Sequence, residues 1–418
     1  MTADTAAPGL ADAALGRQLR QRLATAERLG TLKALGLIAP LIVFVLGLFV
    51  APIALLLTNA VYDPSISANL PLTLAALKHW DGKDIPGEAA FAALVADLKV
   101  VQAANNGPLI GKRLNYEISG IRSKIISSAR KAEGIAAPPY KEQMLAADKI
   151  WGDQLTWAKI SQSGHPWTGF YLLGMLDLER DSDGNIVPVD PDRAVYRNIL
   201  WRTLYIALTV TLATLVLAYP VAYVLANAPA RTANLLMILV LIPFWTSLLV
   251  RTTAWFVLLQ DNGPVNSLLI AMHLTHDPLK LIFSRFGTIV AMTHIQLPFT
   301  LLPIYSVMKG ISPSYMRAAR SLGGGPVISF WKVYLPLTLP GIGAGCLLTF
   351  ILSLGYYITP ALVGGPSDQM VSGIIAGAMN QENNWGKACA LGAILLAATL
   401  VLFWVYNRLV GIDKVKLG

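Results

Sequence analysis

The sequence is short of charge. Asp, Glu, Lys and Arg make up 14% of its 418 residues, whereas soluble globular proteins carry about 25%. Hydrophobic residues make up 55% of the chain. This balance is typical of a protein that exposes much of its surface to lipid, and it argues against a soluble enzyme.

Cysteine is almost absent. The two cysteines, Cys346 and Cys389, both lie in or beside long apolar runs. A disulfide framework needs several cysteines in water-exposed segments. We therefore expect no disulfide and interpret both residues as small apolar side chains in helix packing.

Long apolar runs account for the missing charge. A bilayer core requires about 20 apolar residues per helix, and six runs reach that length. We therefore expect an all-α integral membrane protein with six transmembrane helices, at residues 34–60, 199–227, 233–259, 286–308, 339–363 and 388–410. The first run is longer than the apolar core of a signal peptide, about 7–15 residues, so we expect a retained anchor.

Basic residues collect on one side of these spans, as they do in cytoplasmic loops. The short segments on the other side hold Lys280, Arg285 and Lys387. Both termini, residues 1–33 and 411–418, are therefore expected in the cytoplasm, in a multi-pass protein of the cytoplasmic (inner) membrane. The net charge of +9 suits anionic lipid headgroups and does not require nucleic acid. The basic residues on the inner side are Arg17, Arg20, Arg22, Arg28, Lys33, Arg231, Lys309, Arg317, Arg320, Lys332, Arg408, Lys414 and Lys416.

Residues 61–198, here called the insertion, separate the first two spans. Their charge is nearly balanced, and apolar residues recur at helical spacing, as in Ile118, Ile121 and Ile125. About 130 residues suffice for a small domain. We expect a mostly helical domain on the extracytoplasmic (periplasmic) side.

One stretch of the insertion has the spacing of a calcium loop, with acids at positions 1, 3, 5 and 12 and Gly184 at position 6. The acidic residues are Glu179, Asp181, Asp183 and Asp190. Position 1 is usually Asp and position 12 usually Glu, and Pro188 lies inside the loop. A polar turn built on Asp183 and Gly184 is the favoured alternative.

The loop at residues 312–336, between the fourth and fifth spans, predicts two short amphipathic helices. Ser312 is a favoured N-cap and Pro313 a favoured first residue, and Gly323–Gly325 ends the first helix. Pro326 opens the second helix, which Leu335 and Pro336 would close. The apolar faces need cover, either from a partner protein or from the membrane surface. The apolar residues of the first helix are Tyr315, Ala318, Ala319 and Leu322.

The spacing in this loop resembles the signature of type I, binding-protein-dependent ABC importer permeases. That signature reads Glu-Ala-Ala, three residues, Gly, nine residues, Ile, one residue, Leu-Pro. Two residues depart from it, because Arg317 replaces the usual Glu and Val333 the usual Ile. In this family the loop docks into a cleft of the ATP-binding subunit. The resemblance assigns that role to Arg317, Ala318, Ala319, Gly323, Leu335 and Pro336.

Residues 198–410 are similar more specifically to the spermidine/putrescine permease branch. The resemblance rests on residues 243–255, 261–269 and 357–366 and on Asn384 and Trp385. It implies a permease that moves a small solute, with a polyamine as the best candidate, by alternating access driven by ATP hydrolysis in a partner. The implied partners are a dimer of ABC ATPase subunits, a second permease subunit in a heterodimer, an extracytoplasmic substrate-binding protein and membrane lipids.

Two further absences bear on the energy source. None of the six expected spans contains Asp or Glu, whereas ion-coupled carriers usually keep a carboxylate in the membrane. The sequence also lacks the Gly-x-x-x-x-Gly-Lys-[Ser/Thr] motif. We therefore expect a transport subunit that is not an enzyme and binds no cofactor, with ATP and Mg²⁺ held by the partner. The alternatives are a stand-alone secondary transporter or channel, and an anchored receptor whose insertion acts alone.

Polar residues within spans are candidates for the translocation path. They are Arg251, His294 and Gln296, although a hydrogen bond between helices is the alternative role for His294. A polycation should prefer acidic partners. The acidic candidates at the outer face are Asp261, Asp368 and Glu382.

Overall fold

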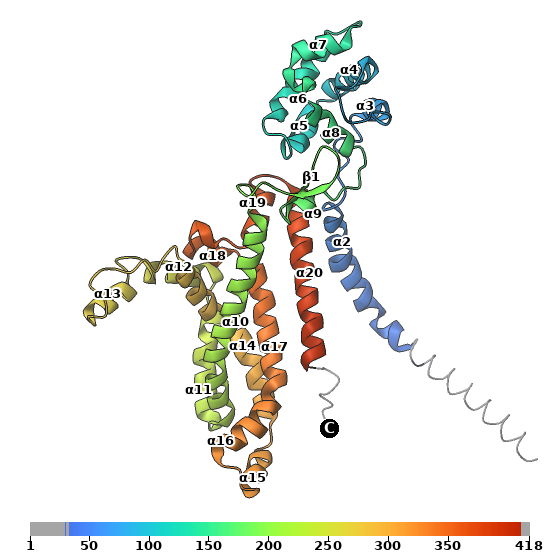
Figure 1. Ribbon diagram of the computed structural model, residues 1–418. Helices are drawn as coiled ribbons and strands as arrows, with labels where there is room; N and C mark the ends of the chain where they lie inside the picture. Colours follow the sequence, from blue (N-terminus) through green and yellow to red (C-terminus); the bar gives the residue numbers. More distant parts are fainter. Residues whose placement is uncertain (1–29, 31–32, 411–418) are drawn as a thin grey trace, which may run out of the picture. The chain divides into compact units, whose positions relative to one another are not determined.

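The computed structural model describes residues 30 and 33–410 (Figure 1). The expected cytoplasmic tails lie outside the described residues, apart from Gly30 and Lys33. The chain divides into two units, residues 1–58 and 59–418, and each is described by itself.

The described part of the first unit is a single apolar helix, Lys33–Thr58. It includes a π-helical turn, η1 (Leu46–Val50), followed by α2 (Ala51–Thr58). Its 26 residues span about 39 Å at 1.5 Å per residue, enough to cross a bilayer. Its apolar side chains are largely exposed within the chain, as expected of a helix that faces lipid.

The second unit begins with the insertion, which is mostly helical, as predicted. Its core surrounds the fully buried side chains of Phe91, Trp151 and Trp157. The carboxylate of Asp97, buried in α4, accepts hydrogen bonds from the backbone N–H and the hydroxyl of Thr73, both at 2.7 Å. The insertion therefore has a hydrophobic core of its own. Its helices are α3 (Pro71–Leu77), α4 (Glu88–Ala103), α5 (Gly107–Asn115), α6 (Ile121–Ala132), α7 (Tyr140–Ala147), η2 (Lys149–Gly152), α8 (Gln154–Gln162) and α9 (Phe170–Gly174).

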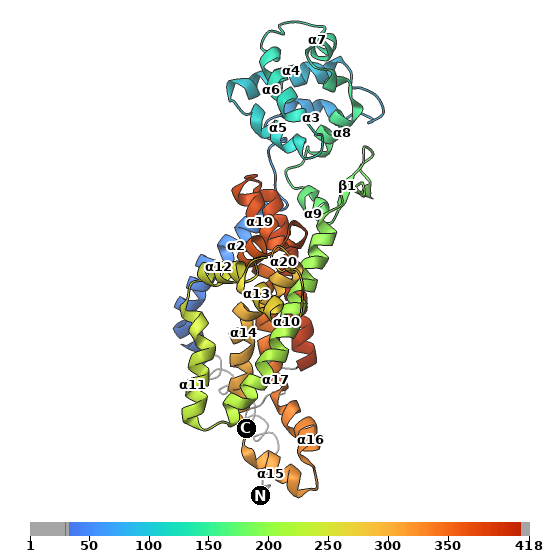
Figure 2. The same ribbon diagram turned by 90° about the vertical axis from the view of Figure 1, so that its left-hand side faces the viewer.

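From Tyr196 onward the chain forms a helical core in which α10 (Tyr196–Asn227), α14 (Arg285–Gly310) and α17 (Leu335–Gly355) pack together (Figures 1 and 2). The Thr300 hydroxyl lies 2.9 Å from that of Thr214 and 2.6 Å from that of Thr349, so it joins the three helices. Close approach also requires Gly345, because a Cβ there would lie 2.6 Å from the Thr300 carbonyl oxygen. Small and hydroxyl residues commonly hold membrane helices together in this way.

The helices of this core are α10 (Tyr196–Asn227), α11 (Ala230–Leu241), η3 (Ile242–Trp245), α12 (Leu248–Leu258), α13 (Pro264–Ala271), α14 (Arg285–Gly310), α15 (Pro313–Ser321), α16 (Pro326–Ser329), η4 (Phe330–Tyr334), α17 (Leu335–Gly355), α18 (Ile358–Val363), η5 (Pro366–Asp368), α19 (Val371–Asn380) and α20 (Trp385–Val410). Proline occupies the first turn of several of them and serine caps others, which is why they begin where they do.

Among the described residues, five helices are long and apolar enough to cross a membrane. A sixth span is obtained only if α11, η3 and α12 are counted as one broken span, bent by 95°. The prediction of one continuous helix at residues 233–259 is therefore wrong. Pro243 cannot continue the hydrogen-bonded ladder, and Ser247 starts a new helix by accepting from the backbone N–H of Val250 at 3.3 Å.

The fifth expected span, residues 339–363, also differs from the structure. Its helix starts earlier, at Pro326, and ends at Gly355. Residues Ile358–Val363 form the separate helix α18. The apolar helix α19 (Val371–Asn380) follows, outside the six runs that predicted transmembrane helices.

Candidate functional site

The expected docking loop forms two helices joined by a bend. The Ser312 hydroxyl accepts from the backbone N–H of Ser314 at 3.4 Å, so it caps α15. Gly323 adopts a φ of +83° just beyond the end of that helix, a conformation that glycine tolerates best. The second helix runs through the π-helical turn η4 into α17. Leu335 and Pro336 therefore lie within the continuous helix Pro326–Gly355, and the prediction that they close the second helix is wrong.

This loop is anchored to the core by aromatic side chains and exposes apolar ones. The rings of Phe330 and Tyr334 stack, with centroids 5.8 Å apart, and Tyr223 of α10 meets Tyr334 edge to face at 5.4 Å. At the bend, in contrast, Leu322 is 89% exposed and Trp331 is 62% exposed. An apolar surface of this kind marks a contact with a partner or a membrane.

Cationic residues surround the same end of the core. A cavity of about 400 Å³ lies between the loop and the last turns of α10 and α14, lined in part by Lys309, Arg317 and Arg320. No carboxylate lines it, and none of the three cations forms an ion pair within the described chain. Arg317 therefore keeps an exposed, uncompensated charge.

The structure separates the three path candidates. The Trp255 indole N–H of α12 donates to Nδ1 of His294 at 3.1 Å, and Arg251 lies one turn before Trp255. Gln296 is buried elsewhere, where its Oε1 accepts from the Ser353 hydroxyl at 2.9 Å. His294 thus belongs to the contact between α12 and α14 and Gln296 to the contact between α14 and α17, whereas the Arg251 guanidinium lies 5.9 Å from the centroid of the Phe244 ring. Sequence reasoning did not single out Trp255, which binds His294.

The three outer acidic candidates also differ in their surroundings. Asp368 is only 4% exposed and pairs with Arg285, Oδ1 to Nε, at 2.9 Å. Glu382 places both carboxylate oxygens 3.0 Å from Nζ of Lys387. Asp261 is exposed and pairs with no cation in the described part of the chain. Two of the three carboxylates are therefore already neutralised by the protein itself.

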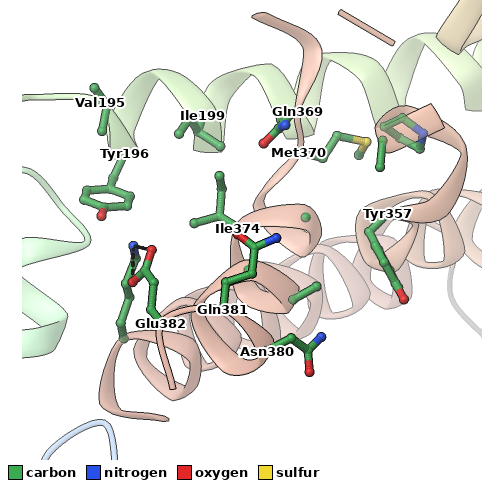
Figure 3. Close-up of a pocket in the computed structure, with 16 residues that line it drawn as sticks. Val195, Tyr196, Ile199, Tyr357, Gln369, Met370, Ile374, Asn380, Gln381 and Glu382 are labelled. Carbon is green, nitrogen blue, oxygen red and sulfur yellow. Dashed lines mark hydrogen bonds and ion pairs between the residues drawn. The ribbon is translucent and has the colours of Figure 1, made fainter. Parts of the chain in front are cut away.

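A cavity of about 460 Å³ opens beside Glu382 (Figure 3), at the end of α10 that lies away from the loop at residues 312–336. The starts of α10 and α20 and residues of α18 and α19 line it. Its polar wall is made of neutral amides, an ion pair and phenols, and its volume suits a small solute. The polar lining residues are Tyr196, Tyr357, Gln369, Asn380, Gln381, Glu382 and Lys387. Only Glu382 among them was expected, because the others meet through tertiary packing.

The insertion contacts the turn that carries Glu382. Nζ of Lys112 donates to the backbone carbonyl oxygens of Glu382 and Asn383, at 3.2 and 2.8 Å. The ring of Tyr171 lies so close to Gly386 that a Cβ there would clash with it. The Tyr171 hydroxyl donates to Oδ2 of Asp63 at 2.8 Å. The insertion therefore meets the core at this turn.

Two phenols at this contact stay protonated at neutral pH. Burial, followed by the nearby carboxylates of Glu382 and Asp63, raises the pKa of Tyr116 to about 12. Burial, followed by the Asp63 carboxylate, also raises the pKa of Tyr171 well above its ordinary value. The neutral Tyr171 phenol is therefore the donor to Asp63.

The acidic stretch at residues 179–190 forms a β-hairpin. Strand β1 (Leu178–Arg180) pairs with β2 (Ile186–Pro188), and Gly184 has a φ of +86° in the turn between them. Oδ1 of Asp181 accepts from the backbone N–H of Asn185 at 2.8 Å, while Glu179 pairs with Arg193 at 3.6 Å. No group of three or more His, Cys, Asp or Glu residues could hold a metal ion within the described residues. Asp183 and Gly184 thus lie in the turn of this hairpin.

Residues 196–411 match the family described as "Binding-protein-dependent transport system inner membrane component". The chain belongs to this family. It is 32% identical over 226 residues to the spermidine/putrescine transport system permease protein PotB of Escherichia coli K12, covering 53% of this chain and 82% of PotB. The Haemophilus influenzae PotB is also 32% identical, over 51% of this chain and 75% of its own length. A solved structure of the MetNI methionine ABC transporter is 19% identical over 53% of this chain and 97% of its own, with a TM-score of 0.41.

The family match and the identity to PotB confirm the resemblance drawn from the sequence. The protein is the permease subunit of an ABC importer, a multi-pass protein of the inner membrane. Permeases of this family work with an ATPase and a substrate-binding protein. The matched region begins at Tyr196, where α10 begins, so nearly all of the insertion lies outside it.

Proposed function

We propose that this permease subunit imports a small cationic solute, with a polyamine such as spermidine or putrescine as the best candidate. The observation that carries the proposal is the 32% identity to PotB over 82% of that protein's length. The cavity beside Glu382 supports it, because neutral amide oxygens and a carboxylate are suitable acceptors for ammonium groups.

Transport proceeds by alternating access, driven by ATP hydrolysis in a dimer of ABC ATPase subunits that hold ATP and Mg²⁺. The docking residues are Arg317, Ala318, Ala319, Gly323, Leu335 and Pro336. The exposed apolar bend and the uncompensated charge of Arg317 support this role. A second permease subunit completes the pathway as a heterodimer. Both termini face the cytoplasm, and the insertion and the 460 Å³ cavity face the extracytoplasmic binding protein.

Reconstitution of the complete importer in proteoliposomes tests this proposal. The permease, its partner permease, the ATPase and the binding protein are assembled, and uptake of radiolabelled spermidine is measured with and without ATP. We expect uptake and stimulated ATPase activity with spermidine, and neither with an ATPase subunit unable to hydrolyse ATP. Stimulation by an unrelated solute such as methionine, and none by spermidine or putrescine, would refute the polyamine assignment. Uptake by the permease alone would favour a stand-alone secondary transporter or channel.

A further inference from the structure

A cation already occupies the polar end of the 460 Å³ cavity, and the protein itself supplies it. Nζ of Lys387 lies 3.0 Å from both carboxylate oxygens of Glu382 and 5.7 Å from the centroid of the Tyr196 ring (Figure 3). Ammonium groups bind favourably over aromatic rings at distances up to about 6 Å. A carboxylate and an aromatic ring thus hold one primary ammonium between them.

No other charged group competes for this position on the cavity wall. Glu382 and Lys387 are the charged side chains among the residues that line the 460 Å³ cavity. The remaining polar groups, the amides of Gln369, Asn380 and Gln381, are neutral and offer carbonyl oxygens to further N–H donors. The cavity is therefore large enough for a small organic cation and carries one acidic anchor for it.

A second cavity, of about 270 Å³, shares Tyr196, Glu382 and Lys387 with the first. Its other carboxylates have fixed partners within the insertion and at the start of α10. Glu117 pairs with Arg113 and Lys159, Glu179 pairs with Arg193, and Asp177 accepts the backbone N–H groups of Tyr196 and Arg197. Glu382 is therefore the carboxylate that lines both cavities, and Lys387 balances its charge.

The pair can exchange partners readily. The Glu382 side chain is 48% exposed, whereas that of Lys387 is 16% exposed. An ion pair with a half-exposed member contributes little net stability. A primary ammonium from solution can therefore reach the Glu382 carboxylate and take the place of Lys387, whose ammonium must then turn towards water because its side chain is only 16% exposed.

We propose that Glu382 and Tyr196 form the cation-recognition pair of this permease, and that the ammonium of Lys387 is a tethered competitor that a cationic solute displaces. This inference takes from the proposed function that the solute is a cation. It adds which residues recognise the solute and that the group recognised is a primary ammonium.

The test follows the reactivity of Lys387 in the complete importer. Lysines are trace-labelled with acetic anhydride at increasing putrescine concentrations, and labelling is quantified by mass spectrometry. We expect labelling of Lys387 to rise at least threefold with putrescine and to stay constant with 1,4-butanediol, an uncharged compound of the same length. Lys280, an exposed lysine with no ion-pair partner among the described residues, is the internal control and should not respond.

Two variants separate recognition from folding, and co-elution of the permease with its partner subunits in size-exclusion chromatography checks that each variant assembles. Glu382→Gln should label Lys387 strongly at all putrescine concentrations. Tyr196→Leu should shift the half-maximal putrescine concentration about two- to fivefold upward. Unchanged labelling of Lys387 in an importer that takes up putrescine would overturn the inference and leave the proposed function standing. A labelling response in an importer that moves no polyamine would instead overturn the proposed function alone.

Discussion

The packing of α14 against α17 makes Gly345 the most informative position for a stability measurement. A Cβ at this residue would lie 2.6 Å from the carbonyl oxygen of Thr300 and 3.2 Å from its Cα. Both atoms belong to the backbone, so a rotamer change cannot relieve the clash. The substitution Gly345→Ala must therefore push the two helices apart and strain the hydroxyl contact of Thr300 with Thr349.

The magnitude follows from opposing contributions. Overpacking a tight contact costs about 1–3 kcal/mol, and a weakened hydrogen bond between membrane helices costs about 0.6 kcal/mol. Alanine offsets about 1 kcal/mol of this through its higher helix propensity. Gly392 of α20 is the matched control, because a Cβ there meets no atom within 4 Å. Gly392→Ala should be neutral or stabilising by up to about 1 kcal/mol.

The two variants should therefore differ by about 1–4 kcal/mol in the free energy of unfolding. The measurement is an SDS titration of the detergent-solubilised protein, followed by circular dichroism. Equal stability of Gly345→Ala and Gly392→Ala would refute the close approach of α14 and α17 described above.

Two further predictions concern the ends of the core. In a background without Cys346 and Cys389, a cysteine introduced at Ser321 should crosslink to the ATPase subunit in intact membranes. A cysteine at the exposed Ser267 of α13 should not. Adding Arg317→Glu should lower the crosslinking yield severalfold if an acidic group of the ATPase faces Arg317, and an unchanged yield would contradict that pairing. At the other end, the raised pKa of Tyr116 predicts alkaline destabilisation. The neutral phenol contributes fully below its ordinary pKa of 10.0, and this contribution is lost as pH rises towards 12. Tyr116→Phe should weaken that pH dependence in urea unfolding, and an equal dependence in both proteins would contradict the assignment.

Features set by a few neighbouring residues could be predicted from the sequence. Ser312, Pro313 and Gly323 define the first helix of the loop at residues 312–336 through local capping and backbone preferences, and the structure has a helix at Pro313–Ser321. The length of the apolar runs likewise predicted the long helices. Such signals act within one or two turns of helix, so they do not depend on the rest of the fold.

Other features depend on contacts that the sequence pattern does not contain. The break between α11 and α12 falls within a run that is apolar throughout, so hydropathy alone predicted one helix there. The pairing of Tyr196 with Glu382 and Lys387 joins residues almost 200 positions apart. Prolines in apolar runs also kink membrane helices without ending them, so Pro243 did not by itself reveal the 95° bend.

The contact of Lys112 with the turn after α19 has a consequence for variation among related chains. Its ammonium is held by the main-chain oxygens of Glu382 and Asn383, which every amino acid presents alike. Through Lys112 the insertion thus binds main-chain atoms of the turn, and this contact does not depend on the side chains at positions 382 and 383. The residues at positions 382 and 383 can therefore differ between related permeases without loss of this contact. Position 112, in contrast, requires a long side chain that ends in a hydrogen-bond donor.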